Sequence, residues 1–173
     1  EMGAQLKRTA ISVNVRERLD FSCALLDQSG YLVANAPHIP VHLGALGLCV
    51  RHSIQAIPEI KEGDILITNH PGFGGSHLPD ITVFAPVFDR NGNILCFLAN
   101  RAHHSEIGGI SPGSMPAGSK DLGQEGVVIP PMHIFQNRHS KLNEIINLLN
   151  AGKYPSRQPE ENRADLSAQI ASL

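Results

Sequence analysis

The sequence predicts a mixed α+β fold in which antiparallel hairpins and long Gly/Pro-rich loops are flanked by helices. Three observations support this prediction. Short apolar runs alternate with turn-forming residues through about the first 130 positions. The 173 residues include 16 glycines and 12 prolines, which indicates abundant loops. Apolar residues at helical spacing are confined to a few stretches. We therefore expect a strand-rich segment over residues 1–135 and a helical segment over 136–173 that is incomplete at its C-terminal end.

Two predicted hairpins account for most of the expected strands. The strands are residues 21–26, 31–34, 64–68, 81–88, 94–100 and 127–129. The first two flank the turn-rich tetrad 27–30 (Asp-Gln-Ser-Gly). The pair 81–88 and 94–100 flanks Asn91-Gly92, which is typical of a type I′ turn. Pro86 removes a backbone donor from its strand, so it indicates an edge strand or a bulge.

The helices and the longest loop follow from apolar spacing and from breakers. The predicted helices are residues 4–9, 46–57, 141–150 and a last one that starts at 165. Pro58 and Gly152 mark two of the helix ends, because proline cannot continue a helix and glycine is favoured just past its end. Residues 108–126 contain six glycines, so we expect a long loop of the kind that is usually functional or mobile.

Composition narrows the function classes. With 14 Lys plus Arg against 16 Asp plus Glu, the net charge of −2 argues against a nucleic-acid binder that neutralises phosphates. No apolar run approaches about 20 residues, so we expect no membrane-spanning helix. There is no pattern of a secretory signal. The cysteines are three, widely spaced and without a CxxC pair, which favours reduced thiols in a cytoplasmic protein.

Polar residues cluster in the sequence just before and just after the predicted hairpin 81–100. They are His70, His77 and Asp80 before it and His103, His104 and Glu106 after it. Antiparallel pairing would bring His77 and Asp80 beside His103. Imidazole nitrogens with a carboxylate suit Zn²⁺, Mn²⁺ or Fe²⁺. We therefore predict a metal site from these three residues, with a position open for a water whose pKa the metal lowers. Asp20 is either a further ligand or base, or an ordinary carboxylate at a strand start.

The other histidines and Glu106 leave alternatives open. His104, Glu106 or His70 would shuttle protons or orient the ligands. Alternatively, the whole constellation caps loop ends and bonds backbone groups. His38 and His42 either face the site or pack beneath it, and packing is favoured because histidine is often partly buried.

Two glycine-rich loops also bear on function. Gly72, Gly74 and Gly75 match neither common nucleotide-binding pattern, and Pro79 argues against a helix directly after them. Close approach of the backbone to a small site or ligand is therefore favoured over nucleotide binding. The loop 108–116 either lines or covers an active site, or is a surface connector.

Several long motifs occur in one order along the chain. They are 18–23 (Arg-Leu-Asp-Phe-Ser-Cys), 40–44 (Pro-Val-His-Leu-Gly), 74–80 (Gly-Gly-Ser-His-Leu-Pro-Asp), 101–104 (Arg-Ala-His-His), 107–116 (Ile-Gly-Gly-Ile-Ser-Pro-Gly-Ser-Met-Pro), 124–126 (Gln-Glu-Gly) and 163–169 (Arg-Ala-Asp-Leu-Ser-Ala-Gln). In these motifs the chain resembles the hydantoinase B / 5-oxoprolinase family, which is related to acetone carboxylase subunits. The resemblance covers nearly the whole chain.

The resemblance implies an activity and a partner. Members of this family are similar to ATP-dependent cyclic amidases that open 5-oxoproline, hydantoins or related lactams. An A-type subunit or domain binds ATP and phosphorylates the carbonyl oxygen, while the B-type part holds a divalent metal and completes the hydrolysis. The matching ligands are His77, Asp80 and His103, with Asp20 as an additional or substitute ligand. Water at the metal would attack the activated carbonyl carbon.

Further details of the resemblance concern charge and substrate. Arg101 and the backbone of Gly108-Gly109 are expected to stabilise developing negative charge. The segment 69–71 (Asn-His-Pro) resembles the 5-oxoprolinase branch and favours an oxoproline-like lactam. Many relatives carry Asp where Glu106 stands, which leaves the role of that carboxylate open.

B-type subunits are several times longer than this chain, so we expect it to be part of a larger subunit. No ATP-binding motif is present, consistent with ATP binding by a partner. Two alternatives remain: a subunit of an ATP-dependent ketone carboxylase, and a non-catalytic fragment or assembly module.

Overall fold

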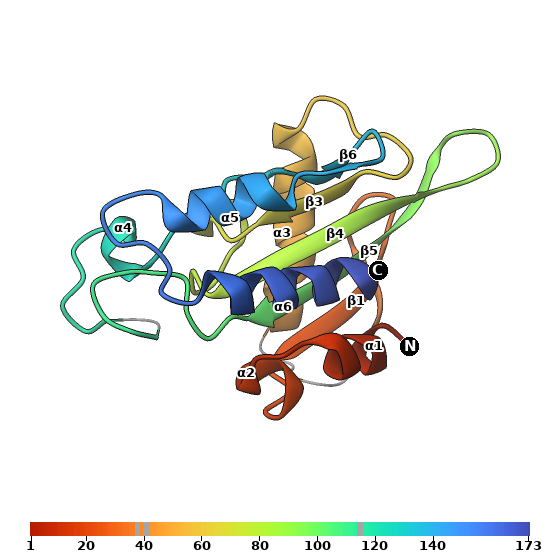
Figure 1. The fold of residues 1–173 in the computed structure, drawn as a ribbon. Coiled ribbons are helices and arrows are strands. Elements are labelled where there is room, and N and C mark those ends of the chain that lie inside the picture. Colours follow the sequence, from red (N-terminus) through yellow and green to blue (C-terminus); the bar gives the residue numbers. More distant parts are fainter. Residues whose placement is uncertain (37–38, 40–41, 114–115) are drawn as a thin grey trace.

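The computed structural model describes residues 1–36, 39, 42–113 and 116–173. Within these residues, seven strands form one antiparallel sheet in the order β2-β1-β5-β4-β3-β6-β7 (Figure 1). The strands are β1 (Phe21–Asp27), β2 (Leu32–Ala36), β3 (Ile65–Thr68), β4 (Asp80–Phe88), β5 (Ile94–His103), β6 (Met132–Gln136) and β7 (His139–Ser140). The helices are α1 (Met2–Thr9), α2 (Val13–Arg16), α3 (Leu43–Ala56), α4 (Leu122–Glu125), α5 (Leu142–Asn150) and α6 (Pro159–Ala171), with a short 3₁₀ turn, η2 (Pro71–Phe73). The predicted mixed α+β fold is confirmed.

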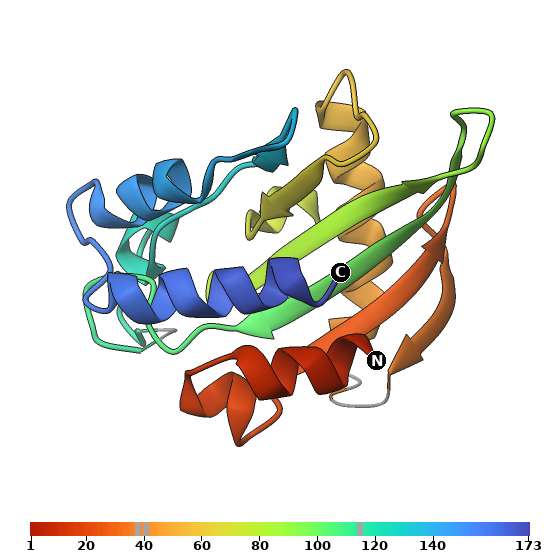
Figure 2. The same ribbon diagram turned by 45° about the vertical axis from the view of Figure 1, so that its right-hand side comes forward.

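Helices cover both faces of the sheet (Figures 1 and 2). On one face, Leu46 and Val50 of α3 pack in a cluster with Phe84 and Phe97, whose rings lie 6.2 Å apart. Helices α5 and α6 lie on the opposite face. Because successive side chains of a strand alternate between faces, the central strands serve two separate cores. Among the described residues, no helix has the length and apolarity to cross a membrane.

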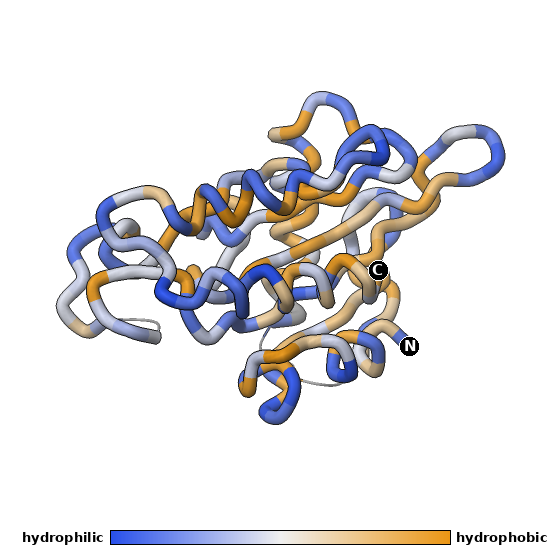
Figure 3. The backbone as a smooth tube through the Cα atoms, in the orientation of Figure 1, coloured by the Kyte–Doolittle hydropathy of each residue, from blue (hydrophilic) through white to orange (hydrophobic). Residues whose placement is uncertain are grey.

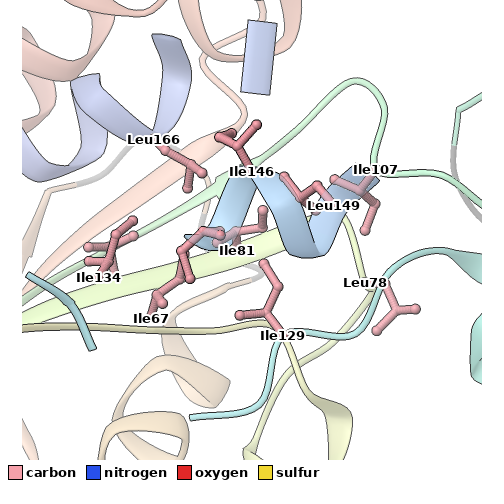
Figure 4. Packing of buried hydrophobic residues seen from close by; sticks show 11 residues of the cluster. Ile67, Leu78, Ile81, Ile107, Ile129, Ile134, Ile146, Leu149 and Leu166 are labelled. Atoms are coloured by element: carbon pink, nitrogen blue, oxygen red, sulfur yellow. The ribbon is translucent and has the colours of Figure 1, made fainter. Parts of the chain in front are cut away.

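The hydrophobic cluster under α5 and α6 joins distant parts of the chain (Figure 4). Its buried members are Ile67, Leu78, Ile81, Val83, Ile107, Ile129, Ile134, Ile145, Ile146, Leu149 and Leu166. Each such side chain contributes about 1.5–3 kcal/mol when fully buried. Residues from both expected segments, 1–135 and 136–173, therefore share one core. In Figure 3 the tip of the β4–β5 hairpin is hydrophilic, while the strands beside the helices are largely hydrophobic.

The two predicted hairpins are present, and their turns are built alike. Asp27 accepts bonds at Oδ1 from the backbone of Ser29 and Tyr31, and Asp89 does the same for Asn91 and Asn93. In each turn the fourth residue is a glycine with positive φ. The predicted type I′ turn at Asn91-Gly92 is wrong, because only the glycine of that pair has positive φ. Instead, the β6–β7 turn has two successive positive values, at Asn137 (52°) and Arg138 (65°).

Three further predictions differ from the structure in detail. Residues 127–129 do not form a strand, and the Asn69 side chain bonds their backbone at Val127 and Ile129. The unpredicted β6 and β7 span the expected boundary between 135 and 136. Helix α6 starts at Pro159, six residues before position 165.

Pro86 lies in a central strand, but β3 pairs with β4 only from Thr82 to Phe84. Strand β4 is therefore locally an edge at Pro86, and its register with β5 shifts at Val87/Phe88. The expectation of an edge or a bulge is confirmed in this local form.

Candidate metal centre

Three strand ends meet at the candidate site. Asp80 opens β4 and is paired with His103 at the end of β5. Asp20 directly precedes β1, and its carbonyl accepts a bond of 3.0 Å from the backbone N–H of His103. The polar residues on the α3 face of these strands are Asp20, Ser22, Asp80, Thr82, Arg101 and His103. The same face is apolar farther along the strands, so one end of the sheet is set apart by polarity.

Asp80 lies between two imidazoles. Its Oδ1 is 2.7 Å from Nδ1 of His103, and its Oδ2 is 3.3 Å from Nδ1 of His77. One ligand atom from each of the three residues lies within 4.8 Å of the others. The side chain of Asp80 is fully buried, that of His103 is 15% exposed and that of His77 is 49% exposed. The cluster is thus closed on the sheet side and open to solvent at His77.

Hydrogen bonds keep the Asp80 carboxylate ionised. Burial alone would raise its pKa, but bonds from His103, His42 and Ser76 outweigh burial and hold the pKa of Asp80 well below its ordinary value. Burial lowers the pKa of His103, but the hydrogen bond to Asp80 and the charges of Asp80 and Asp20 raise it overall. The cluster therefore has a fixed negative charge at its centre.

His42, the residue that directly precedes α3, reaches the same carboxylate. It is buried, with Nε2 3.5 Å from Asp80 Oδ1 and 4.0 Å from Asp20 Oδ1. Its Nδ1 lies 3.4 Å from Oγ of Ser22, whose hydroxyl donates to the carbonyl of Ile39. His42 is thus packed, as favoured, and also faces the site. The alternatives for His38 lie outside the described residues.

The donors suit a divalent metal. Two imidazoles and one carboxylate match the ligand preferences of Zn²⁺, Mn²⁺ and Fe²⁺, and their atoms lie close enough together to be candidate ligands of one ion. Asp20 lies beside the cluster but outside the three-residue group; its side chain is 30% exposed.

Arg101 lies beneath the cluster rather than in it. It is fully buried, with Nε donating to Thr82 Oγ1 at 2.8 Å and Nη2 to the Gly74 carbonyl at 3.0 Å. Its Nη1 donates to Oγ of Ser76 at 3.4 Å. The guanidinium is therefore hydrogen-bonded both to β4 and to the loop before it.

His104 points to the opposite face of the sheet. Its Nε2 lies 2.9 Å from Oε1 of Gln169, and its Nδ1 lies 3.3 Å from the amide nitrogen of Asn162. Because the Gln169 amide donates to the Ile81 carbonyl and to Asn100 Oδ1, its Oε1 must accept from His104. Burial lowers the pKa of His104 and favours the neutral ring. The structure does not bring His104 to the cluster, and its ring instead forms a buried polar link to α6.

Glu106 organises the loop that follows β5. Its carboxylate accepts bonds from the backbone of Gly108 and Gly113 and pairs with Arg157 at 3.0 Å. At Gly108, φ is +91° and an added Cβ would lie 2.3 Å from the Tyr154 carbonyl, so only glycine fits. Glu106 is therefore committed to the loop and not to the cluster.

The two backbone N–H groups that were expected to stabilise charge, those of Gly108 and Gly109, both have acceptors within the protein. The N–H of Gly108 donates to Glu106, and that of Gly109 donates to the Tyr154 carbonyl. The loop that contains Gly72, Gly74 and Gly75 was expected to bring its backbone close to a small site or ligand. Its backbone instead approaches α3, since a Cβ at Gly74 would lie 2.7 Å from the Cys49 nitrogen. The His70 ring accepts a hydrogen bond at Nδ1 from the backbone N–H of Gly72 in the same loop.

Several residues that hydrogen-bond the expected site residues were not predicted from the sequence. They are Ser76, Thr82, Asn162, Gln169 and Arg157. Ser76 and Gln169 lie within the motifs 74–80 and 163–169 that carry the family resemblance, and this position could have marked them as candidates. The others are ordinary polar residues whose partners lie far away in the sequence.

The fold and the cluster together define a class of protein: a mixed α+β chain that gathers two histidines and an aspartate at one end of a sheet as candidate metal ligands. The chain matches the Hydantoinase B/oxoprolinase family over residues 1–173 and belongs to that family. The family resemblance read from the motifs is thereby confirmed.

The chain spans only a small part of the length of the relatives that it matches. It is 48% identical to 5-oxoprolinase of Saccharomyces cerevisiae over 179 residues, which cover 99% of this chain and 14% of that protein. The crystal structure of ATP-dependent caprolactamase from Pseudomonas jessenii has a TM-score of 0.82 at 28% identity, over 99% of this chain and 29% of that one. Nucleotide-free acetone carboxylase has a TM-score of 0.86 over 99% of this chain and 22% of that one; at 22% identity this likeness concerns the fold alone.

Proposed function

We propose that this chain is the metal-holding, B-type part of an ATP-dependent hydrolase that opens a cyclic amide such as 5-oxoproline, a hydantoin or a similar lactam. The observation that carries the proposal is the convergence of His77, Asp80 and His103 within 4.8 Å in a member of this family. The names of two relatives, an oxoprolinase and an ATP-dependent caprolactamase, support a lactam as substrate.

The proposed division of labour needs a partner. An ATP-binding A-type subunit or domain would activate the lactam carbonyl by phosphorylation, and the remainder of the B subunit would complete the pocket around the open side at His77. A divalent metal held by His77, Asp80 and His103, with Asp20 beside them, would polarise a carbonyl and lower the pKa of water. We place the assembly in the cytoplasm, where the free thiols of Cys23, Cys49 and Cys96 would stay reduced.

The residues of this chain have distinct tasks in this proposal. Asp80 keeps its charge between the two imidazoles and so fixes their orientation. His103 is held in place by the strand pairing of β4 and β5. The roles in proton transfer and charge stabilisation first considered for His104, Glu106 and Arg101 become positioning roles, because their polar atoms are engaged elsewhere.

The test measures metal content and turnover in the full chain. Elemental analysis is expected to find a stoichiometric divalent metal that is lost in His77→Ala. ATP hydrolysis is expected to depend on both a lactam and the A-type partner. Equal metal content in the two proteins would reject the site, and lactam-independent ATP hydrolysis would reject the activity.

A second candidate function, that of a subunit of an ATP-dependent ketone carboxylase, follows from the family resemblance of the sequence motifs. In that case bicarbonate and a ketone would replace the lactam and water. Incorporation of labelled bicarbonate into product would favour a carboxylase. Failure of both assays, with unchanged activity of the assembly after His77→Ala and His103→Ala, would leave an assembly module.

A further inference from the structure

We propose that Arg101 is a positioning residue of the candidate centre and acts through Ser76. This inference rests on the proposed function, because it explains how the loop residue His77 is held against the strand residue Asp80. His103 and Asp80 are aligned by strand pairing, whereas His77 lies in the turn before β4. Its carbonyl accepts from the Asp80 N–H at 2.9 Å and its own N–H donates to Asp80 Oδ2 at 3.4 Å, so its place depends on how that carboxylate is held.

The geometry joins Arg101 to Asp80 through one hydroxyl. Arg101 lies two residues before His103 on the same face of β5, and its Nη1 donates to Ser76 Oγ at 3.4 Å. A guanidinium has no acceptor, so Ser76 Oγ must accept this bond. The single O–H of Ser76 is then directed to Oδ2 of Asp80, to which it donates. That oxygen is the one that faces His77.

The same guanidinium fixes both sides of the loop. Nε is bonded to Thr82 in β4, and Nη2 is bonded to the carbonyl of Gly74. Gly74 in turn packs directly against the backbone of Cys49 in α3. The segment 74–77 is therefore held between the sheet and α3, with Arg101 as the link to the sheet.

The charge of Arg101 favours a role tied to the centre. The side chain is fully buried, and among the described residues no carboxylate lies within 4.0 Å of it. A buried charge without a direct counterion is costly, so packing alone would favour an apolar residue here. The Asp80 carboxylate, linked to Arg101 through the Ser76 hydroxyl, provides a nearby buried negative charge that offsets part of this cost.

The experiment measures Mn²⁺ affinity in the full chain by titration calorimetry. Ser76→Ala and Arg101→Lys are each expected to weaken binding about tenfold, as loss of an outer partner of a ligand commonly does. The double variant is expected to lose about tenfold as well, and not a hundredfold, because both changes break one chain of bonds. Ser76→Thr keeps the hydroxyl and is expected to bind like the unsubstituted protein.

The controls separate folding from positioning. Ser53→Ala removes a buried hydroxyl that has no partner in the described structure and is expected to leave affinity unchanged. If Arg101→Lys does not fold, the pair Ser76→Ala and Ser76→Thr decides the question. Unchanged affinity in Ser76→Ala, together with loss in His103→Ala, would overturn this inference and leave the proposed function standing. Multiplicative losses in the double variant would overturn the link through Ser76. Absence of binding in the unsubstituted chain would overturn both proposals.

Discussion

Two adjacent histidines at the end of β5 have opposite environments. His103 faces α3 and meets Asp80 at 2.7 Å in a cluster that opens to solvent. His104 faces α6, is fully buried and has both ring nitrogens bonded to amides. The hydrogen bond to Asp80 raises the pKa of His103 against the effect of burial, whereas burial lowers the pKa of His104. The pair shows that strand alternation, and not residue type, separates a candidate ligand from a structural residue.

The largest difference between the two histidines is expected in metal binding. His103→Ala removes a ligand and should reduce Mn²⁺ affinity by about a hundredfold or more, beyond the effect of losing an outer partner. His104→Ala should change affinity by only a fewfold. Titration calorimetry on both variants provides the measurement. Equal losses would erase the distinction between the two faces.

Stability should show the reverse order. His104→Ala leaves Gln169 Oε1 and the Asn162 amide without their buried partner, so we expect a loss of about 2–4 kcal/mol in the free energy of unfolding. His103→Ala should cost less, because its side chain is partly exposed. Urea denaturation followed by circular dichroism measures both. A larger loss for His103→Ala would contradict the assignment of His104.

A smaller effect is expected in the loop after His104. Glu106→Ala removes the acceptor of two backbone N–H groups and of Arg157, so the loop should loosen at a cost of about 1–2 kcal/mol. Limited proteolysis should then cleave within residues 108–118 faster than in the unsubstituted chain. Arg157→Gln, which removes only the partly exposed ion pair, should increase cleavage less. An unchanged cleavage rate in Glu106→Ala would show that other contacts hold the loop.

The smallest effect concerns a thiol on the α6 side of the sheet. Burial raises the pKa of the Cys23 thiol to about 11, so at pH 8 almost none of it is thiolate. Cys23 should therefore react with iodoacetamide more slowly than the partly exposed Cys96, and only pH values near 11 or unfolding should remove the protection. Mass spectrometry of each cysteine checks this order. Equal rates would indicate that this face opens readily.

Much of the site could be predicted because its ligands follow from a hairpin. Pairing of β4 with β5 is local in sequence, so the proximity of Asp80 to His103 could be expected before any coordinates. The roles of His104 and Glu106 could not, because their partners Gln169, Asn162 and Arg157 are more than 50 positions away.

Two detailed predictions within the correctly predicted fold class failed, because a side chain bonds the backbone at each place. The turn at Asn91 follows from the Asp89 side chain, which competes with the type I′ geometry that the Asn-Gly pair alone suggests. The stretch at Val127 has strand-like composition but is bonded by the distant side chain of Asn69. A local side-chain contact decided the first case, and a tertiary contact decided the second.

The histidine doublet also has a consequence for strand register. If β5 slipped by one residue against β4, every side chain would change faces, and His104 would replace His103 opposite Asp80. The same slip would take Arg101 away from Thr82 and Gly74 and put it in the place of Asn100, whose bonds to the Gln169 carbonyl and the Ser172 hydroxyl would be lost. A one-residue slip would still place a histidine opposite Asp80, but the lost bonds of Arg101 would make the slipped register less stable.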